Sequence, residues 1–347
     1  MTTELLGLTP EELQTELSPL GEKPFRAKQI FSWLQRGMRF SEMSNLPLAL
    51  REKLASLYVD QPVEILERHV SQMDGTVKLL YALRDQNCVE GVVMRYHYGV
   101  TLCLSTQVGC AMGCAFCAST LDGCVRSLTA AEMLGQVMCA DRMLAESGER
   151  VSHIVLMGSG EPLQNYDNVV RFLRLVSHPE GKNIGLRHIS LSTCGLPAQI
   201  RRLADEGLPV TLSLSLHAPN DRIRQRLMPV AKRYTIEETL DACRYYLKKI
   251  GRRIILEYAL IDKVNADQAH ALELARLLRG MQCHVNLIPL NTVRERNLFG
   301  VTEGQVTSFL NTLTAQHISA TRRREMGDDI QGACGQLRQK HLKEQTT

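Results

Sequence analysis

The sequence has no apolar run of the roughly 18 residues that a membrane-spanning helix requires. An integral membrane protein is therefore excluded. The first residues also lack the basic-then-apolar pattern of a secretory signal, so we expect a cytoplasmic protein. A heptad repeat is missing as well, and we expect a monomer. The formal net charge of +4 is too small to indicate nucleic-acid binding by itself, so any RNA site must be a local basic patch.

Cysteine, by contrast, is plentiful. Eleven cysteines, an odd number scattered along the chain, are typical of a reducing compartment with metal-binding or catalytic thiols. Three of them form a C-x3-C-x2-C run at Cys110, Cys114 and Cys117. This spacing lets three thiolates from one short loop hold an iron–sulfur cluster and leaves one iron open to another ligand. The alternative is a structural zinc site, which needs a fourth Cys or His at short spacing; Cys124 is the nearest candidate and has no CxxC partner.

The first hundred residues predict a small unit of helices and antiparallel strands. Three helices, each beginning near a proline (Pro10, Pro24 and Pro47), occupy residues 1–60. Alternating apolar residues then predict strands at 63–70 and 77–84, joined at Asp74-Gly75, and a third strand at 89–98. We interpret residues 1–98 as an accessory domain.

Residues 99–347 repeat the order strand, loop, helix. Several helices are predicted to begin with a capping box, at Thr129 with Glu132, at Thr235 with Glu238, and at Thr302 with Gln305. Such alternation indicates parallel strands with crossover helices, so the fold is predicted to be α/β, with a partial (β/α)6 barrel as one catalytic domain. The predicted strands are 100–105, 153–157, 188–192, 210–216, 253–260 and 284–288, with a last strand at 318–323.

Polar and glycine residues follow these strands where each one ends. In barrels of this kind the carboxyl ends of the strands form the active-site rim. A glycine-rich turn or a histidine at one such end is usually structural, but a shared position on one rim favours a functional site. The residues are Gly160, Glu161, Ser192, Ser215, Leu216, His217 and Asn291.

The chain resembles a known family over nearly its whole length. The resemblance rests on the cysteine run with Phe116 before its third cysteine, and on the segments VMRYHYGVTLCLSTQVGCAMGCAFCAST, GSGEP, SLSLHAPND, LIPLN, GDDIQGACGQL and FRAKQIFSWL. These are similar to the radical S-adenosylmethionine (SAM) methyltransferases that modify C2 of adenine in 23S ribosomal RNA and transfer RNA. The resemblance implies a [4Fe-4S] cluster on Cys110, Cys114 and Cys117, two SAM molecules per turnover, an RNA-binding helical accessory domain, and an electron donor such as flavodoxin or ferredoxin.

The same resemblance assigns roles to individual residues. It implies that Cys334 is S-methylated by one SAM, and that a radical from a second SAM activates this methyl group for addition to adenine C2. Glu90 then matches the proposed proton acceptor, and Cys103 matches the cysteine that releases the RNA and forms a disulfide with Cys334. The rim residues from Gly160 to Asn291 match the positions that contact SAM.

Two other functions remain open from the sequence. One is the related branch that methylates C8 of adenine and confers antibiotic resistance; it tends to carry alanine after Gly-Glu, so Pro162 favours C2. The other is a non-catalytic RNA-binding protein with a structural metal. Metal analysis distinguishes the two classes: zinc favours the binding protein, and iron with acid-labile sulfide favours the enzyme. Four short runs of basic residues are candidates for contacts with RNA phosphates. The alternative is that they are solvated edges without a binding role. The runs are 248–249, 252–253, 322–324 and 338–343.

Overall fold

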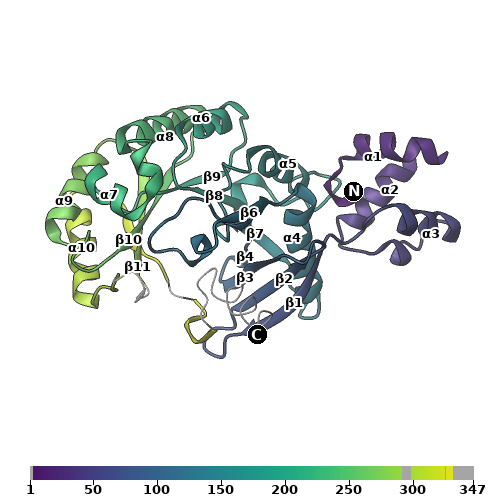
Figure 1. The fold of residues 1–347 in the computed structure, drawn as a ribbon, viewed down its shortest axis with the longest axis horizontal. Helices are drawn as coiled ribbons and strands as arrows, with labels where there is room; N and C mark the ends of the chain where they lie inside the picture. Colours follow the sequence, from purple (N-terminus) through teal and green to yellow (C-terminus); the bar gives the residue numbers. More distant parts are fainter. Residues whose placement is uncertain (1–2, 291–297, 325, 331–347) are drawn as a thin grey trace.

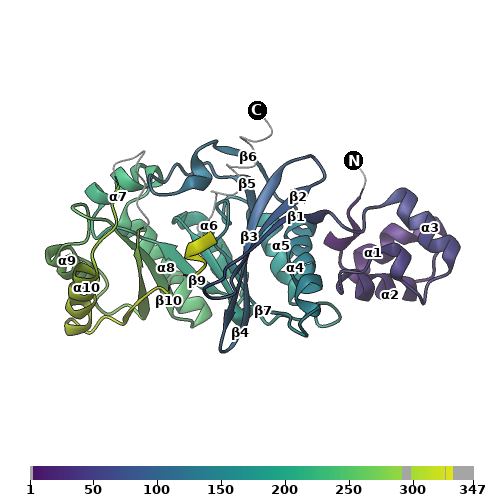
Figure 2. The same ribbon diagram turned by 90° about the horizontal axis from the view of Figure 1, so that it is seen from below.

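The computed structural model describes residues 3–290, 298–324 and 326–330 (Figure 1). Asn291 and Cys334 lie outside these ranges. A ten-stranded sheet with the order β1-β2-β3-β4-β7-β8-β9-β10-β11-β12 forms the centre of the molecule. The helices that follow its parallel strands cover the outer face, and a separate group of helices extends from one end (Figures 1 and 2).

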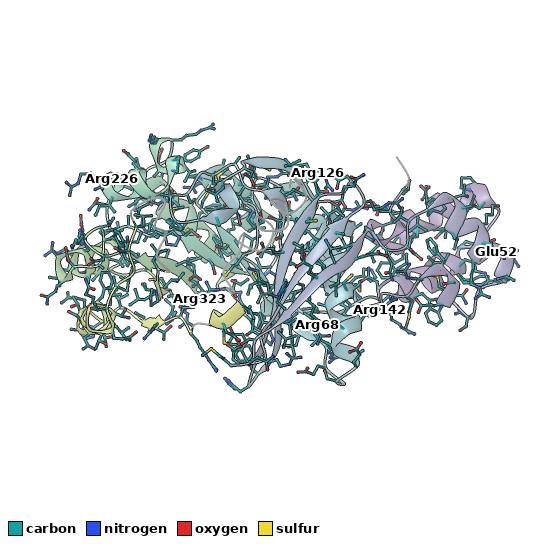
Figure 3. All side chains as sticks on the ribbon, turned by 60° about the horizontal axis from the view of Figure 1, so that its bottom comes forward. Glu52, Arg68, Arg126, Arg142, Arg226 and Arg323 are labelled. Carbon is teal, nitrogen blue, oxygen red and sulfur yellow. The ribbon has the colours of Figure 1, made fainter. Side chains whose placement is uncertain are left out.

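The extending group contains the three helices predicted from their prolines. They are α1 (Pro10–Leu17), α2 (Phe25–Leu34) and α3 (Leu48–Leu57). Each has an apolar face, and Leu13, Ile30 and Leu54 are fully buried in the shared core. Arg142 of the first barrel helix holds the group in place, because its guanidinium donates to the Gly37 carbonyl and pairs with Glu42 at 3.1 Å (Figure 3).

The antiparallel strands follow as predicted. They are β1 (Val63–Val70), β2 (Val77–Leu83) and β3 (Cys88–Tyr96). Asp74 Oδ1 accepts the Thr76 N–H at 2.9 Å in the hairpin turn, and Gly75 has the positive φ of +70° that such turns require. Because β3 also pairs with β4 (Gly99–Cys103), these strands continue the barrel sheet. Hydrogen bonding therefore marks no break at residue 98, and that domain boundary stays a prediction.

Seven strands run parallel and form the predicted partial barrel. After β4 they are β7 (Val151–Leu156), β8 (Ile189–Thr193), β9 (Thr211–Ser215), β10 (Ile254–Leu260), β11 (Cys283–Pro289) and β12 (Ala320–Arg322).

The helices between these strands cover the outside of the sheet. They are α4 (Ala130–Ala145), α5 (Tyr166–Val176), α6 (Pro197–Asp205), α7 (Asp221–Leu227), α8 (Ile236–Ile250), α9 (Gln268–Leu277) and α10 (Glu303–Ala315). All three predicted capping boxes, before α4, α8 and α10, are confirmed. Within the described ranges, no helix combines the length and apolarity that crossing a membrane requires.

Side chains alternate along the strands, so the sheet has an apolar outer face and a polar inner face. Leu212 and Leu214 of β9 belong to the main hydrophobic core together with Leu240 of α8. Because successive strand residues point to opposite faces, Ser213 and Ser215 face the barrel interior. The polar residues of the strands thus line the inside of the barrel, where a ligand has access to them.

One element was not predicted from the sequence. A small two-stranded sheet, β5 (Gln107–Gly109) with β6 (Cys124–Ser127), encloses the loop that carries the cysteine run. A Cβ atom on Gly109, which has φ +77°, would lie 2.1 Å from the Gly123 carbonyl oxygen, so only glycine allows this close approach. Strands of three and four residues are too short to produce a recognisable periodicity.

Candidate active site

The cysteine loop lies across the end of the barrel where the parallel strands terminate. Its first side is held by β6, since the Cys110 N–H donates to the Gly123 carbonyl at 2.8 Å. Its second side is held by α7, since the Ala115 N–H donates to the Leu227 carbonyl at 2.8 Å (Figure 1). The loop is therefore supported from two elements that are far apart in sequence.

The three thiols of this loop influence one another's ionisation. Burial raises the pKa of Cys110 to about 12, and the nearby thiol of Cys117 acts in the same direction. Burial also raises the pKa of Cys114, which both Cys110 and Cys117 raise further. Clustered buried thiols ionise only when a cation compensates them, and a bound metal centre supplies that charge. Among the described residues no three such side chains converge on one metal-ion position, but in a cluster each thiolate bonds a different iron. The donor set fits an iron–sulfur cluster.

A buried arginine, which sequence reasoning did not identify, lies behind the loop. Arg224 of α7 has no exposed surface, and its guanidinium donates to the carbonyls of Cys194 at 2.6 Å, Leu216 at 3.2 Å and Ser215 at 3.3 Å. Its Nη1 has no hydrogen-bond partner in the part of the chain that the structure describes. Burial lowers the pKa of Arg224, and the neighbouring thiols of Cys194 and Cys114 oppose that shift. The arginine thus ties the ends of β8 and β9 together and places positive charge beside the cysteine loop.

Replacing Arg224 with methionine should destabilise the protein by about 3 kcal/mol or more, because three buried carbonyls lose their donors. Urea unfolding of the anaerobically purified protein measures the change. Arg226, exposed on the same helix (Figure 3), is the matched control, and Arg226→Met should change stability by less than about 0.5 kcal/mol. Equal stabilities for the two variants would contradict a structural role for Arg224.

Glu161, which follows β7, is held by the backbone of the neighbouring strand end. Its Oε2 accepts the Cys194 N–H at 2.7 Å and its Oε1 accepts the Leu163 N–H at 3.0 Å. Burial raises the pKa of this carboxyl, and these hydrogen bonds act against the rise. Gly160 beside it has φ +111°, and a Cβ there would lie 2.7 Å from Thr106 Oγ1. Both carboxylate oxygens of Glu161 already have donors, and its backbone carbonyl accepts the N–H groups of Gln164 at 3.0 Å and Asn165 at 3.4 Å. Among the backbone hydrogen bonds of the described residues none ends on the Gly160 carbonyl, which is therefore the acceptor that this turn can offer to a ligand.

His217 ends β9 in a left-handed conformation, with φ +55°. Its Nδ1 accepts the Ala259 N–H at 2.9 Å, which places the ring proton on Nε2. Burial and the charge of Arg224 lower its pKa to about 3, so the imidazole is neutral. The ring also meets Phe116 edge-on, with 4.6 Å between centroids. His217 therefore links the cysteine loop to β9 and β10.

The remaining rim residues lie side by side. Ser192 Oγ and Ser215 Oγ are 3.5 Å apart, and the N–H groups of Leu216 and His217 both donate to the Glu257 carbonyl. Glu257 itself was not identified from the sequence, although a carboxylate inside the apolar strand Ile254–Leu260 is a signal of a special position. Its side chain accepts the Asn286 amide at 2.9 Å inside the barrel, and burial raises its pKa.

Cys103 and Glu90 lie on the wall of the barrel that β3 and β4 form, opposite the cysteine loop. Cys103 ends β4 and pairs in register with Val92 of β3, two residues beyond Glu90, so the three share one face. Cys103 packs with Val92 and Met94, and Met326 of the C-terminal segment contacts the same cluster. The structure therefore brings together the two residues that the sequence separates by thirteen positions.

The C-terminal segment is attached to the β1–β2 turn beside this wall. Asp74 Oδ2 accepts the Gly327 N–H at 2.9 Å, and Asp329 accepts Ser71 Oγ–H at 2.7 Å and the Gln72 N–H at 2.9 Å. Figure 2 shows the yellow turn Asp328–Ile330 lying next to β3. The chain that leads to Cys334 thus passes close to Cys103.

Removing this attachment by Asp329→Asn combined with Asp74→Asn should lower the rate of the RNA methylation that the family resemblance implies by roughly tenfold, because misplacing a reactive group is costly. The iron content should stay unchanged. Single-turnover assays measure the rate. Asp241→Asn, which breaks an exposed pair with Arg244, is the control and should have no effect.

The same attachment should weaken in acid. Burial raises the pKa of Asp74, but hydrogen bonds from Gly327, Thr76 and Ser71 outweigh it and lower the pKa from an ordinary 3.8 to about 2. A lowered folded-state pKa means that the contribution is complete above pH 3.8 and is lost as the pH falls through about 2. The protection of the Gly327 and Ile330 amide hydrogens, taken relative to the intrinsic exchange rate at each pH, should therefore fall between these pH values in the wild type. The double variant should lack this pH dependence.

Of the cysteines expected to be small buried side chains, Cys88, Cys194, Cys243 and Cys283 are buried, whereas Cys139 is half-buried and its thiol donates to the Val63 carbonyl. Cys194 and Cys243 are buried, and burial raises the pKa of each thiol. The ten cysteines that the structure describes form no disulfide with one another. The pairing of Cys103 with Cys334 involves a residue outside the described ranges and stays a prediction.

Known proteins match both parts of the chain. Residues 104–275 match the model of the Radical SAM superfamily, and residues 3–59 match that of the ribosomal RNA large subunit methyltransferase N-terminal domain. The probable dual-specificity RNA methyltransferase RlmN of Alkaliphilus oremlandii is 54% identical over 340 residues, which cover 98% of this chain and 98% of that relative. The chain belongs to the RlmN family of radical SAM methyltransferases.

Further relatives agree with this membership. The probable dual-specificity RNA methyltransferase RlmN of Alkaliphilus metalliredigens is 50% identical over 343 residues, covering 99% of this chain and 97% of its own length. The crystal structure of a radical SAM methyltransferase from Sphaerobacter thermophilus superimposes with a TM-score of 0.93 at 44% identity, covering 96% of this chain and 98% of that one. As a radical SAM enzyme of the RlmN family, the protein uses a [4Fe-4S] cluster and SAM.

Proposed function

We propose that this protein methylates C2 of adenine in 23S ribosomal RNA and transfer RNA through an S-methylcysteine at Cys334. The observation that carries the proposal is the shared barrel mouth. The cysteine loop with its Arg224 support lies on one side, and Cys103 and Glu90 lie on the wall to which the C-terminal segment is attached. A cluster, a nucleophilic thiol and a proton acceptor can thus reach one RNA base.

Cys110, Cys114 and Cys117 would hold the cluster. The Gly160 carbonyl and the Glu161 carboxylate are proposed as acceptors for the ammonium of SAM, while the hydroxyls of Ser192 and Ser215 suit its carboxylate and ribose. Leu216, His217 and Asn291 complete the proposed set, with the His217 Nε2–H as a donor. When bound, the cluster and SAM would supply a carbon radical. Adenine C2 is electron-poor and therefore a weak nucleophile toward a sulfonium methyl group, but it can accept a carbon radical.

The chain's own residues carry the methyl group and the proton. Cys334 is proposed to take a methyl group from SAM by displacement, since a thiolate is the strongest common nucleophile in proteins. After this methyl carbon has joined adenine C2, Glu90 takes the proton from C2. Cys103 then attacks the sulfur of Cys334, so the S–S bond forms as the C–S bond to the RNA adduct breaks. The carbon keeps that electron pair, takes up a proton and leaves as the methyl group of the RNA, and a Cys103–Cys334 disulfide remains for reduction. The positions of Glu90 and Cys103 on one sheet face support this division of roles.

RNA contact is proposed for the helical unit and for part of the basic segment near β12. That segment is not a uniform basic edge, because Arg322 pairs with Glu303 and the charge of Arg323 acts on the buried Glu257 (Figure 3). Arg324 is exposed and suits a phosphate. Because the proposed substrates are ribosomal and transfer RNA, we propose that the reaction takes place in the cytoplasm. A flavodoxin or ferredoxin is the proposed electron donor, and the protein is proposed to act as a monomer.

The test is the identity of the product. Anaerobically reconstituted protein is incubated with SAM, a reductant and unmodified 23S RNA fragment or transfer RNA, and the digested RNA is analysed by mass spectrometry against standards. We expect 2-methyladenosine from both RNAs. 8-Methyladenosine would refute the C2 assignment and the preference drawn from Pro162, and methylation of only one RNA would refute the dual substrate range.

A further inference from the structure

The wall of the barrel mouth contains an ion pair in which the proposed function gives a role to Glu90 and none to its partner, Lys78. Lys78 Nζ of β2 lies 3.3 Å from Glu90 Oε2 of β3, and the two side chains are only 2% and 3% exposed. Charged side chains are rarely buried this completely, and removing two charges from water often costs more than their attraction returns. A pair of well-packed apolar residues would stabilise the sheet at least as well, so stability alone does not account for Lys78.

The position of the pair relates it to the reaction. Lys78 is in register with Val92 of β3, and Val92 is in register with Cys103 of β4. Glu90 is two residues from Val92 on the same strand and therefore points to the same face. Lys78, Glu90 and Cys103 consequently lie on one face of three neighbouring strands, beside the attached C-terminal segment.

A carboxylate can accept a proton only while it is ionised. In a site this buried, an isolated carboxylate favours its neutral form, and an ammonium group at ion-pair distance favours the charged form. Ser105 Oγ donates to the Glu90 carbonyl at 2.7 Å and so fixes the backbone of Glu90 from the next strand. The ammonium thus contacts the carboxylate of Glu90, while Ser105 holds the backbone from which that side chain extends.

We propose that Lys78 is a positioning residue for proton removal from adenine C2, acting through the buried ion pair that holds the Glu90 carboxylate in place. This inference rests on the proposed function, in which Glu90 is the acceptor. In the step concerned, the C2–H bond breaks, the proton moves to Glu90 and the bonding electron pair stays with the RNA adduct. The ammonium of Lys78 keeps its proton throughout.

The experiment compares Lys78→Met, Lys78→Arg and Glu90→Gln in the full-length, cluster-loaded enzyme with SAM, reductant and the RNA fragment. Three quantities are measured: S-methylation of Cys334 by peptide mass spectrometry, covalent protein–RNA adduct on denaturing gels, and released methylated RNA. Lys182→Met is the matched control, since Lys182 forms a largely buried pair with Asp141 of α4, outside the barrel.

Lys78→Met should methylate Cys334 normally, accumulate adduct and release product roughly tenfold more slowly. Glu90→Gln should accumulate adduct with release slowed about 100-fold or more, the usual contribution of a general base. Lys78→Arg keeps the charge and should retain most of the activity, and Lys182→Met should release product at the wild-type rate.

Several outcomes would overturn the inference. If Glu90→Gln traps adduct while Lys78→Met releases product at the wild-type rate, Lys78 has no such role and the proposed function stands. A defect in Lys78→Arg as large as that in Lys78→Met, or loss of iron or of S-methylation, would show that Lys78 only maintains the fold. Normal release by Glu90→Gln would instead remove Glu90 from the proposed function, and the inference would fail with it.

Discussion

Cys334→Ala should abolish methylation of RNA while the protein still assembles its iron–sulfur cluster. The loss is complete because, in the proposed route, the methyl group reaches adenine through the sulfur of Cys334. Cluster assembly is expected to persist because Cys110, Cys114 and Cys117 belong to a loop that hydrogen bonds to Gly123, next to β6, and to Leu227 of α7. Iron and acid-labile sulfide analysis measures the cluster, and mass spectrometry of digested RNA measures the product.

Cys283→Ala provides the control for this experiment. Cys283 is a buried thiol at the start of β11, at the end of the strand opposite the barrel mouth, and its loss should leave activity near that of the wild type. Methylated RNA from the Cys334→Ala variant would rule out the S-methylcysteine route. Loss of the cluster in that variant would mean that Cys334 also supports the metal centre.

Cys103→Ala, with Cys334 intact, should accumulate a covalent complex between protein and RNA and should release almost no product. In the proposed route the sulfur of Cys103 is the only nucleophile that cleaves the bond between Cys334 and the RNA. The packing of Cys103 with Val92 and Met94 leaves space for alanine, so we expect the fold to persist. Denaturing gels with labelled RNA detect the complex.

Cys103→Ser and the double variant Cys103→Ala with Cys334→Ala sharpen this prediction. The serine variant should also trap the complex, because a hydroxyl does not perform thiol–disulfide chemistry. The double variant should form no complex, since the bond to RNA passes through Cys334. Free methylated RNA from Cys103→Ala would show that another residue performs the release.

Much of the fold was predictable because its signals are local. The strand Val63–Val70 and the capping boxes at Thr129, Thr235 and Thr302 depend on residues within a few positions of one another. The small sheet of β5 and β6 was missed because its strands lie on the two sides of the cysteine loop, and their pairing depends on the close approach of Gly109 and Gly123.

The sequence by itself determined the chemistry that is available: the three-cysteine run, the polar strand ends and the resemblance to a methyltransferase family. Spacing and residue type are sufficient for this, because both are local properties of the chain. Only the tertiary structure decided which of these groups meet. Lys78 faces Glu90 because β2 and β3 pair in one register, Arg224 reaches the ends of β8 and β9 from α7, and Asp74 holds Gly327 from the far end of the chain. Contacts of this kind depend on sheet register and long-range packing, which the order of residues along the chain does not express.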